Sequence, residues 1–266
     1  MLPFAQTFVA IAAAILFPSF VGLLLISAAG RSARPAYLAA FAFGIYLWFW
    51  SDTAGDASYL DVNQGYAGGL THAYLVLLFA AGVLLMAWAD RGTFSSRPGV
   101  GRMGFAVPVL VAFAVGFHGF GEGAAFSETA AVTAGTDLLS VFGGLYSAVG
   151  FVLHKALEPM IAGAAYLIYA KDHARGPSSY LSDILVLTIV FSLPGLVGGA
   201  TDYFLGYDAT YFFAFGLGTS TYAVARMARP LFWEGGGSTN DSLKVAAFIL
   251  LGLLAIYMAA LFHSTG

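Results

Sequence analysis

Two short stretches of this sequence combine imidazole and carboxylate side chains at a spacing that could bind a cation. In HGFGE, His118 stands four residues before Glu122, and in HKALE, His154 stands four residues before Glu158. Residues four apart share one face of an α-helix, so each stretch presents one imidazole and one carboxylate together. Both stretches lie in long apolar segments, where ionisable side chains are costly and mark functional sites.

If the two helix faces meet, they supply four nitrogen and oxygen ligands for one metal ion. This ligand set suits Zn²⁺, and Fe²⁺, Mn²⁺ and Cd²⁺ accept the same ligand types. Two carboxylates also neutralise the charge of one divalent cation. The chain has no cysteine, which excludes a thiolate site. We therefore predict a metal site, with zinc as the leading candidate, formed by the four residues His118, Glu122, His154 and Glu158.

Lys155 is a cation inside the apolar segment that carries His154 and Glu158. It follows His154 directly, about 100° further round the helix, so we expect it to border the site rather than bind the ion. Its ammonium group could pair with Glu122 or Glu158 and repel a second cation. We also expect Gly121 and Pro159 to make their helices irregular, which would free backbone carbonyl groups for ions or water. The alternative for the whole set is a structural network of interhelical hydrogen bonds and ion pairs.

The segments that carry these residues are far more apolar than a soluble protein allows. Of 266 residues, 59% are hydrophobic and 9% are charged, whereas soluble domains have about 25% charged residues. A helix that crosses the roughly 30 Å hydrocarbon layer needs about 20 apolar residues. We predict an all-α, multi-pass membrane protein in which residues 1–266 form a single transmembrane domain. Its eight predicted spans lie near 4–29, 35–50, 70–89, 103–126, 138–170, 181–200, 209–228 and 243–263.

The positive charges predict the orientation of the bundle. Every lysine and arginine except Lys155 falls at or between spans one and two, three and four, five and six, or seven and eight. The positive-inside rule makes that side cytoplasmic and places both termini outside the cell membrane. An even number of spans is consistent with this result. The net charge of −3 gives no reason to expect a nucleic-acid partner.

The motifs also resemble a known family. HGFGEG (118–123) resembles the HNxPEG signature on the fourth helix of the ZIP (Zrt/Irt-like) metal transporters, and HKALEP (154–159) resembles the HExPEG signature on the fifth. FSLPGLVGGA (191–200) and AFGLGTSTYAVARMARP (214–230) are similar to the sixth and seventh helices. FAFGIYLWFW (41–50) looks like the second helix. The likeness extends over nearly the whole chain.

The resemblance implies a ZIP-like bundle that admits a divalent metal ion towards the cytoplasm. His118, Glu122, His154 and Glu158 match the primary metal site of the family. Gly119, Lys155 and Leu193 replace ligands of the family's second site, so the chain resembles a member in which an ammonium group replaces the second ion. Helices one, four, five and six would move against the other four. Asp52 and Asp56, at the outer end of span two, would line the route by which the ion enters.

Other functions are compatible with the same residues. The site could belong to a metal sensor, or to a structural membrane subunit that moves no ions. His118 and His154 could instead bind haem b axially in an electron carrier. A zinc hydrolase would need an HExxH motif, which is missing because Lys155 follows His154, so we do not expect an enzyme. The expected partners are the lipid bilayer and the metal ion, and the small residues of GLGTS (216–220) would let two copies pack as a homodimer.

Overall fold

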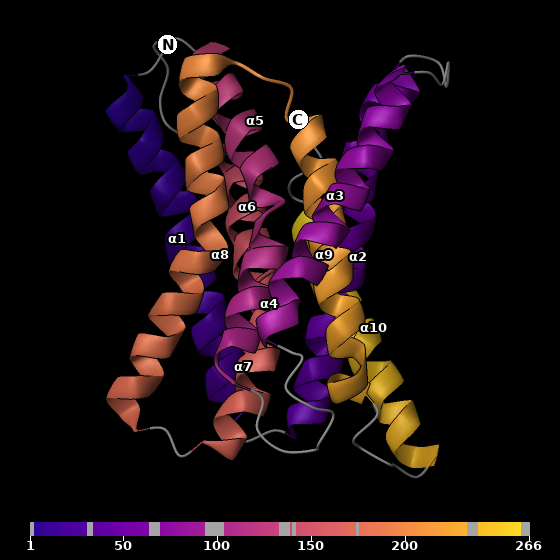
Figure 1. The fold of residues 1–266 in the computed structure, drawn as a ribbon. Helices are drawn as coiled ribbons and strands as arrows, with labels where there is room; N and C mark the ends of the chain where they lie inside the picture. Colours follow the sequence, from indigo (N-terminus) through magenta and orange to yellow (C-terminus); the bar gives the residue numbers. More distant parts are fainter. Residues whose placement is uncertain are drawn as a thin grey trace.

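The computed structural model describes residues 3–30, 34–63, 70–93, 104–132, 139, 142–173, 176–232 and 239–261, and these residues form helices and turns without a strand. The chain folds as a bundle of antiparallel helices (Figure 1). The helices are α1 (Phe4–Ala29), α2 (Pro35–Asn63), α3 (Leu70–Thr93), α4 (Ala106–Gly116), α5 (Gly119–Val132), α6 (Leu145–Leu157), α7 (Met160–Asp172), α8 (Pro177–Leu205), α9 (Thr210–Phe232) and α10 (Thr239–Leu261).

Within the described residues, six helical segments are long and apolar enough to cross a membrane. They are α1, α8, most of α3 and α10, and the combined segments Ala106–Glu128 and Leu145–Ala170. The other two predicted spans, 35–50 and 209–228, fall in α2 and α9, which are not among these six segments. The all-helical architecture with several membrane-crossing helices therefore agrees with the sequence prediction.

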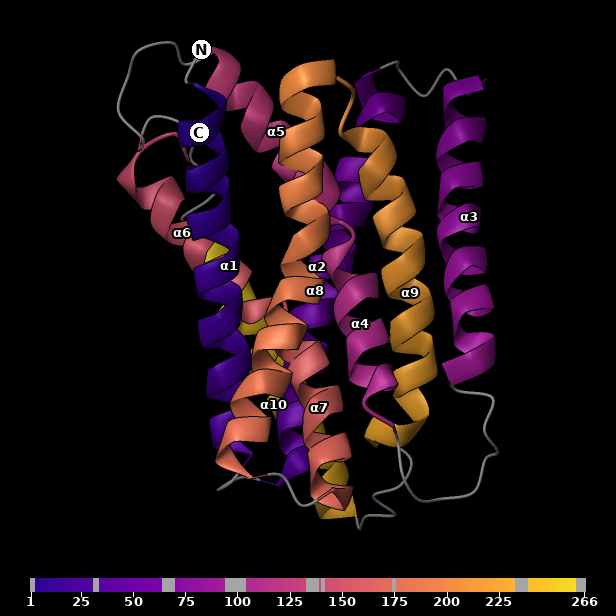
Figure 2. The ribbon, with the colours of Figure 1, turned by 60° about the vertical axis from the view of Figure 1, so that its left-hand side comes forward.

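With α4–α5 and α6–α7 each taken as one broken segment, successive segments alternate in direction along one axis (Figures 1 and 2). Helix α1 begins and α10 ends towards the same end of the bundle, which is the upper end in both views. At the opposite end, α1 is followed by α2, α3 by α4, α7 by α8, and α9 by α10. The lysines and arginines outside the apolar segments cluster in sequence around these four connections. We call this end of the bundle the basic end.

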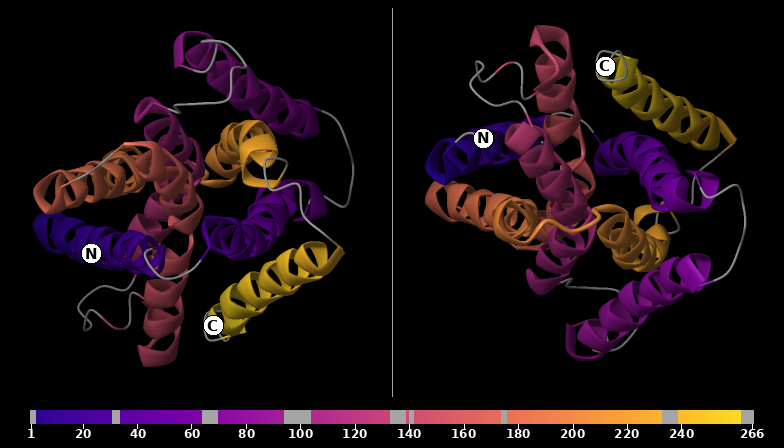
Figure 3. Two further views of the ribbon diagram at one scale, coloured as in Figure 1. Left: turned by 90° about the horizontal axis from the view of Figure 1, so that it is seen from below. Right: turned by 90° about the horizontal axis from the view of Figure 1, so that it is seen from above.

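The helices pack in two groups, which Figure 3 shows along the bundle axis. In the first group, α8 packs against α1, α4 and α5, and α1 also contacts α6 and α7. In the second group, α2 packs against α9 and α10, and α3 packs against α9. Contacts of α2 with α7 and of α4 with α9 join the two groups.

Two of the predicted spans are each broken into two helices. The span predicted at 103–126 is α4 followed by α5, with a turn at Phe117 and His118. The span predicted at 138–170 contains α6 and α7, with a turn at Glu158 and Pro159. The interruption expected at Pro159 is confirmed, because proline has no N–H for the carbonyl four residues earlier. The other break lies three residues before Gly121, which is in the first turn of α5 and whose amide donates to the carbonyl oxygen of His118 at 2.9 Å.

The start of the fifth predicted span also needs correction. The apolar run from residue 138 predicts a helix there, but α6 begins only at Leu145. Gly143 and Gly144 adopt φ angles of 77° and 113°, a region that residues with a Cβ atom rarely enter. The amide of Gly144 donates to the carbonyl oxygen of Leu139, which closes a turn before the helix. Hydropathy could not reveal this turn because its side chains are apolar.

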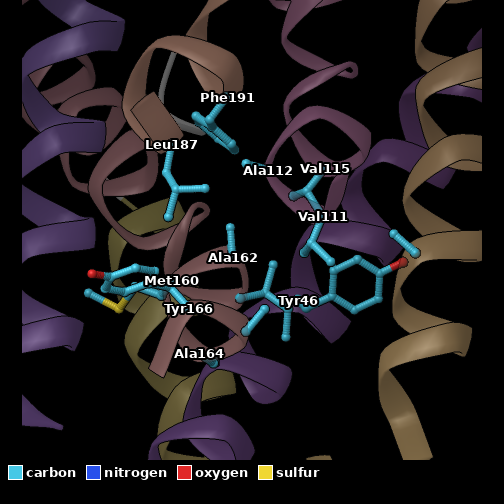
Figure 4. Close-up of a cluster of buried hydrophobic side chains, with 14 of the residues drawn as sticks. Tyr46, Val111, Ala112, Val115, Met160, Ala162, Ala164, Tyr166, Leu187 and Phe191 are labelled. Atoms are coloured by element: carbon cyan, nitrogen blue, oxygen red, sulfur yellow. The ribbon is translucent and has the colours of Figure 1, made fainter. Parts of the chain in front are cut away.

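The largest group of buried apolar side chains lies beside α4 and α7, on the side of the two helix breaks that faces the basic end (Figure 4). It includes Val111 and Val115 of α4, Tyr166 of α7, and Leu187 and Phe191 of α8. Each of these side chains is at most 2% exposed. Apolar side chains therefore fill the interior between the helix breaks and the basic end.

Glycines let the backbones of α5 and α8 approach closely. A Cβ atom on Gly123 would overlap the carbonyl oxygen of Gly195, and one on Gly198 would overlap the carbonyl oxygen of Phe120. Such contacts between small residues replace the hydrophobic effect as a source of helix association in lipid. The same packing fixes the start of α5, which carries Glu122.

We expect Gly123→Ala to destabilise the bundle because its methyl group cannot fit beside Gly195. Overpacking of this kind typically lowers the free energy of unfolding by about 1–3 kcal/mol. The matched control is Gly55→Ala in α2, where a Cβ atom meets nothing within 4 Å. Thermal unfolding of the detergent-purified protein should show a lower Tm for Gly123→Ala and an unchanged or higher Tm for Gly55→Ala. Equal Tm values for the two variants would contradict the packing described here.

Candidate metal site

The two helix breaks place acidic and basic side chains at the helix ends that favour them. Glu122 lies in the first turn of α5, where the helix dipole stabilises a negative charge. His154 and Lys155 lie in the last turn of α6, where the dipole stabilises a positive charge. Glu158 follows directly, in the turn before α7. In Figure 1, α4 lies below α5 and α7 lies below α6, so both breaks fall in the middle of the bundle.

Side-chain hydroxyl groups of neighbouring helices donate hydrogen bonds to backbone carbonyl groups beside these breaks. Pro159 cannot donate to the carbonyl group of Lys155, and the hydroxyl group of Ser19 on α1 donates to that oxygen instead, at 3.3 Å. Similarly, the hydroxyl group of Thr219 on α9 donates to the carbonyl oxygen of Ala114 at 2.8 Å. A buried carbonyl group without a partner is destabilising. These two hydroxyl groups therefore hold the breaks in place.

The orientation of the His118 ring leaves one nitrogen available as a ligand. Its Nδ1 atom contacts the carbonyl oxygen of Val115, which can only accept a hydrogen bond, so Nδ1 carries the proton. In the neutral ring, Nε2 then keeps its lone pair. This atom lies 3.5 Å from Glu122 Oε2 and 3.2 Å from Glu158 Oε1. A backbone carbonyl group that fixes the tautomer in this way is typical of metal-binding histidines.

The ammonium group of Lys155 lies among the same atoms. It donates to Glu122 Oε2, to Glu158 Oε2 at 2.7 Å and to His118 Nε2 at 3.3 Å. An ammonium group has three N–H donors, and these three acceptors satisfy all of them. We expected Lys155 to pair with one of the two glutamates, and in the structure it pairs with both. Its side chain is 1% exposed, so this cation is fully inside the protein.

The second oxygen of Glu158 faces both imidazole rings. Glu158 Oε1 lies 2.5 Å from His154 Nε2 and 3.2 Å from His118 Nε2. Neither contact meets hydrogen-bond geometry, so this buried oxygen has no hydrogen-bond partner among the described residues. The Glu158 side chain is 0% exposed. A buried carboxylate oxygen of this kind favours a cation nearby.

Three of the four predicted ligands come together in a way that could hold a metal ion. One ligand atom from each of His118, Glu122 and Glu158 lies within 4.8 Å of the other two. His154 lies beside this group, against Glu158. One imidazole nitrogen with a lone pair and two carboxylates fit a divalent cation of the zinc type. The predicted helix faces therefore do meet, although Lys155 takes a central place that the spacing did not indicate.

Apolar groups from the second helix group border the site. The Phe49 ring of α2 lies edge-on to the His118 ring, with 4.2 Å between ring centroids. Gly216 of α9 packs directly on the backbone of His118, where a larger residue would not fit. Among the acidic ligands, only Glu122 is partly exposed, with 18% of its side chain accessible. Of the three residues that could hold an ion, Glu122 is therefore the most accessible.

The residues predicted to line the ion's route lie on α2 near this site. Asp52 is exposed and lies about one helical turn beyond Phe49, which touches His118. The side chain of Asp56 is outside the residues whose side chains the structure describes. In GLGTS (216–220), Gly216 packs on the backbone of His118 and Gly218 packs on α3.

Sequence reasoning missed the residues that support the site from other helices. Ser19, Phe49 and Thr219 carry no charge and fit their own helices without conflict. Pro159 signals that the carbonyl group of Lys155 needs another donor, but the sequence does not identify Ser19 as that donor. Only the packing of α1, α2 and α9 against the breaks brings these residues to the site.

Comparisons with protein families and with curated proteins find no relative of this chain. No protein-family model matches the chain, and no curated protein sequence matches it either.

Proposed function

We propose that this chain is a multi-pass membrane protein that moves a divalent metal ion, most suitably Zn²⁺, across the membrane through one site. His118, Glu122 and Glu158 bind the ion, and His154 contributes as a fourth ligand or by positioning Glu158. The bundle crosses the membrane eight times, with α4–α5 and α6–α7 each forming one crossing. The basic end faces the cytoplasm and both termini face outward.

One observation carries this proposal: the three ligand atoms of His118, Glu122 and Glu158 converge within 4.8 Å at two helix breaks. Broken helices in the middle of a membrane bundle are a common setting for ion sites, because the backbone is irregular only where it faces protein or a polar cavity. With the proton on Nδ1, His118 Nε2 keeps a lone pair that can bind the ion in place of its contact with the Lys155 ammonium group. The buried Glu158 Oε1 adds an acceptor without a hydrogen bond.

The arrangement of the helices supports transport over passive binding. All four predicted ligands belong to the first helix group, while α2 and α9 of the second group border the site with an aromatic ring and a glycine. A shift of one group against the other would carry the ligands together. This division matches the moving unit and scaffold that the ZIP resemblance implies. In this structure the site is closed towards the basic end by packed apolar side chains.

The site supports haem less well than a metal ion. Axial binding would place a flat macrocycle between His118 and His154. Glu158 and Lys155 fill the space beside both rings, and Glu158 Oε1 approaches both Nε2 atoms. A sensor or a structural subunit would use the same metal site without flux, so only a transport measurement separates these functions.

Metal binding is the first test. We expect the purified protein to bind about one Zn²⁺ per chain and Glu158→Gln to weaken binding by about 100-fold or more, because even second-shell changes cost 10- to 100-fold. Glu128→Gln is the matched control, since Glu128 is an exposed glutamate on the neighbouring α5. Isothermal titration calorimetry measures both the number of Zn²⁺ ions bound per chain and the affinity. If Zn²⁺ bound equally to both variants, the ion would have to sit elsewhere.

His154→Gln tests the role of the fourth residue. Since His154 contacts Glu158 at 2.5 Å but lies beside the three-ligand group, we expect its loss to weaken Zn²⁺ binding by about tenfold, as for a second-shell residue. The same titration measures this. A loss as large as that of Glu158→Gln would instead make His154 a direct ligand.

Transport is tested with ⁶⁵Zn²⁺ in proteoliposomes. We expect saturable uptake by the native protein and by Glu128→Gln. Uptake by Glu122→Gln should fall at least about tenfold, because Glu122 is both a ligand and the partly exposed residue of the site. Zn²⁺ binding without uptake by the native protein would refute transport and favour the sensor or structural role.

A further inference from the structure

The head group of Lys155 occupies the place that the proposed function assigns to a metal ion. Its Nζ atom contacts Glu122 Oε2, Glu158 Oε2 and His118 Nε2. These are the same three residues whose ligand atoms could hold an ion. A metal ion and this ammonium group would need the same acceptors, and two cations so close together would repel each other strongly in a buried site.

We propose that Lys155 is a tethered competitor of the metal ion, which must leave the three acceptors before the ion can bind. This inference rests on the proposed function. Without metal, the ammonium group keeps Glu122 and Glu158 together by reducing their mutual repulsion. When a metal ion binds, its positive charge replaces that of the ammonium group between the two glutamates. Lys155 thereby sets the metal concentration at which the site fills.

The structure also offers Lys155 a second position. Its Nζ atom already lies 5.8 Å from the centroid of the Phe151 ring, one helical turn earlier on α6. A cation over an aromatic face is attracted by the ring even outside an ion pair. Phe151 is half-buried and also packs against the rings of Phe126 and Phe142. In the proposed exchange, rotation about the lysine side-chain bonds would move the head group from the acceptors towards the Phe151 ring.

The first test compares Zn²⁺ affinities of the full-length protein in detergent. Lys155→Met keeps the length of the side chain and removes its charge, so the competitor is lost. If the ammonium group holds the site for more than about nine-tenths of the time, this variant should bind Zn²⁺ at least about tenfold more tightly than the native protein. Lys155→Arg keeps a cation and should show no gain. Lys244→Met, at an exposed lysine on α10, is the control for the loss of a positive charge.

The outcomes separate this inference from the proposed function. Tighter binding by Lys155→Met alone supports competition. Measurable binding with the same affinity in the native protein and in Lys155→Met overturns competition and leaves the metal site standing. An absence of Zn²⁺ binding from all variants, Lys155→Met included, overturns both.

A second measurement uses the native protein and does not depend on a variant that folds. Reductive methylation followed by mass spectrometry reports how accessible each lysine amine is, with Lys244 as the internal reference. Saturating Zn²⁺ should increase the labelling of Lys155 several-fold relative to Lys244, because the amine has left the glutamates. Labelling of Lys155 that stays constant or falls while Zn²⁺ binds would show that the ammonium group remains in place and would overturn the competition.

Discussion

The balance of charge around Lys155 is the constraint on which the rest of this structure depends. Two carboxylates that face each other in an apolar interior repel, and each costs roughly 2.5–3.5 kcal/mol to bury even on the gentler scales. The ammonium group joins Glu122 and Glu158 through two ion pairs. Without a cation at this point, the two acids would repel each other or one of them would take up a proton.

In this bundle, the cation and its acceptors meet at the ends of helices rather than in their middles. Each of the two central segments is broken once, at His118 and at Pro159, and the ionisable residues gather around these breaks. Helix dipoles then stabilise Glu122 at the start of α5 and Lys155 at the end of α6. Hydroxyl groups from α1 and α9 bind carbonyl groups beside the breaks, so the irregular backbone remains satisfied in a setting without water.

Close packing turns this local arrangement into a defined site. Glycine contacts between α5 and α8 and between α9 and His118 allow backbones to approach where side chains would separate them. The apolar side chains of α4, α7 and α8 fill the interior towards the basic end, whereas part of the Glu122 side chain stays accessible.

The sequence by itself determined the class of the protein and the identity of its ionisable residues. Apolar segments of membrane length, and His118, Glu122, His154 and Glu158 at helical spacing, follow from composition and periodicity, which are local properties. Hydropathy could not find the turn at Gly143 and Gly144, because apolar residues form both turns and helices in lipid. Nor could spacing place Lys155 at the centre of the site, since its position depends on how α5 and α6 face each other. Only the tertiary structure decided that three acceptors surround this ammonium group, because these contacts join residues from separate helices.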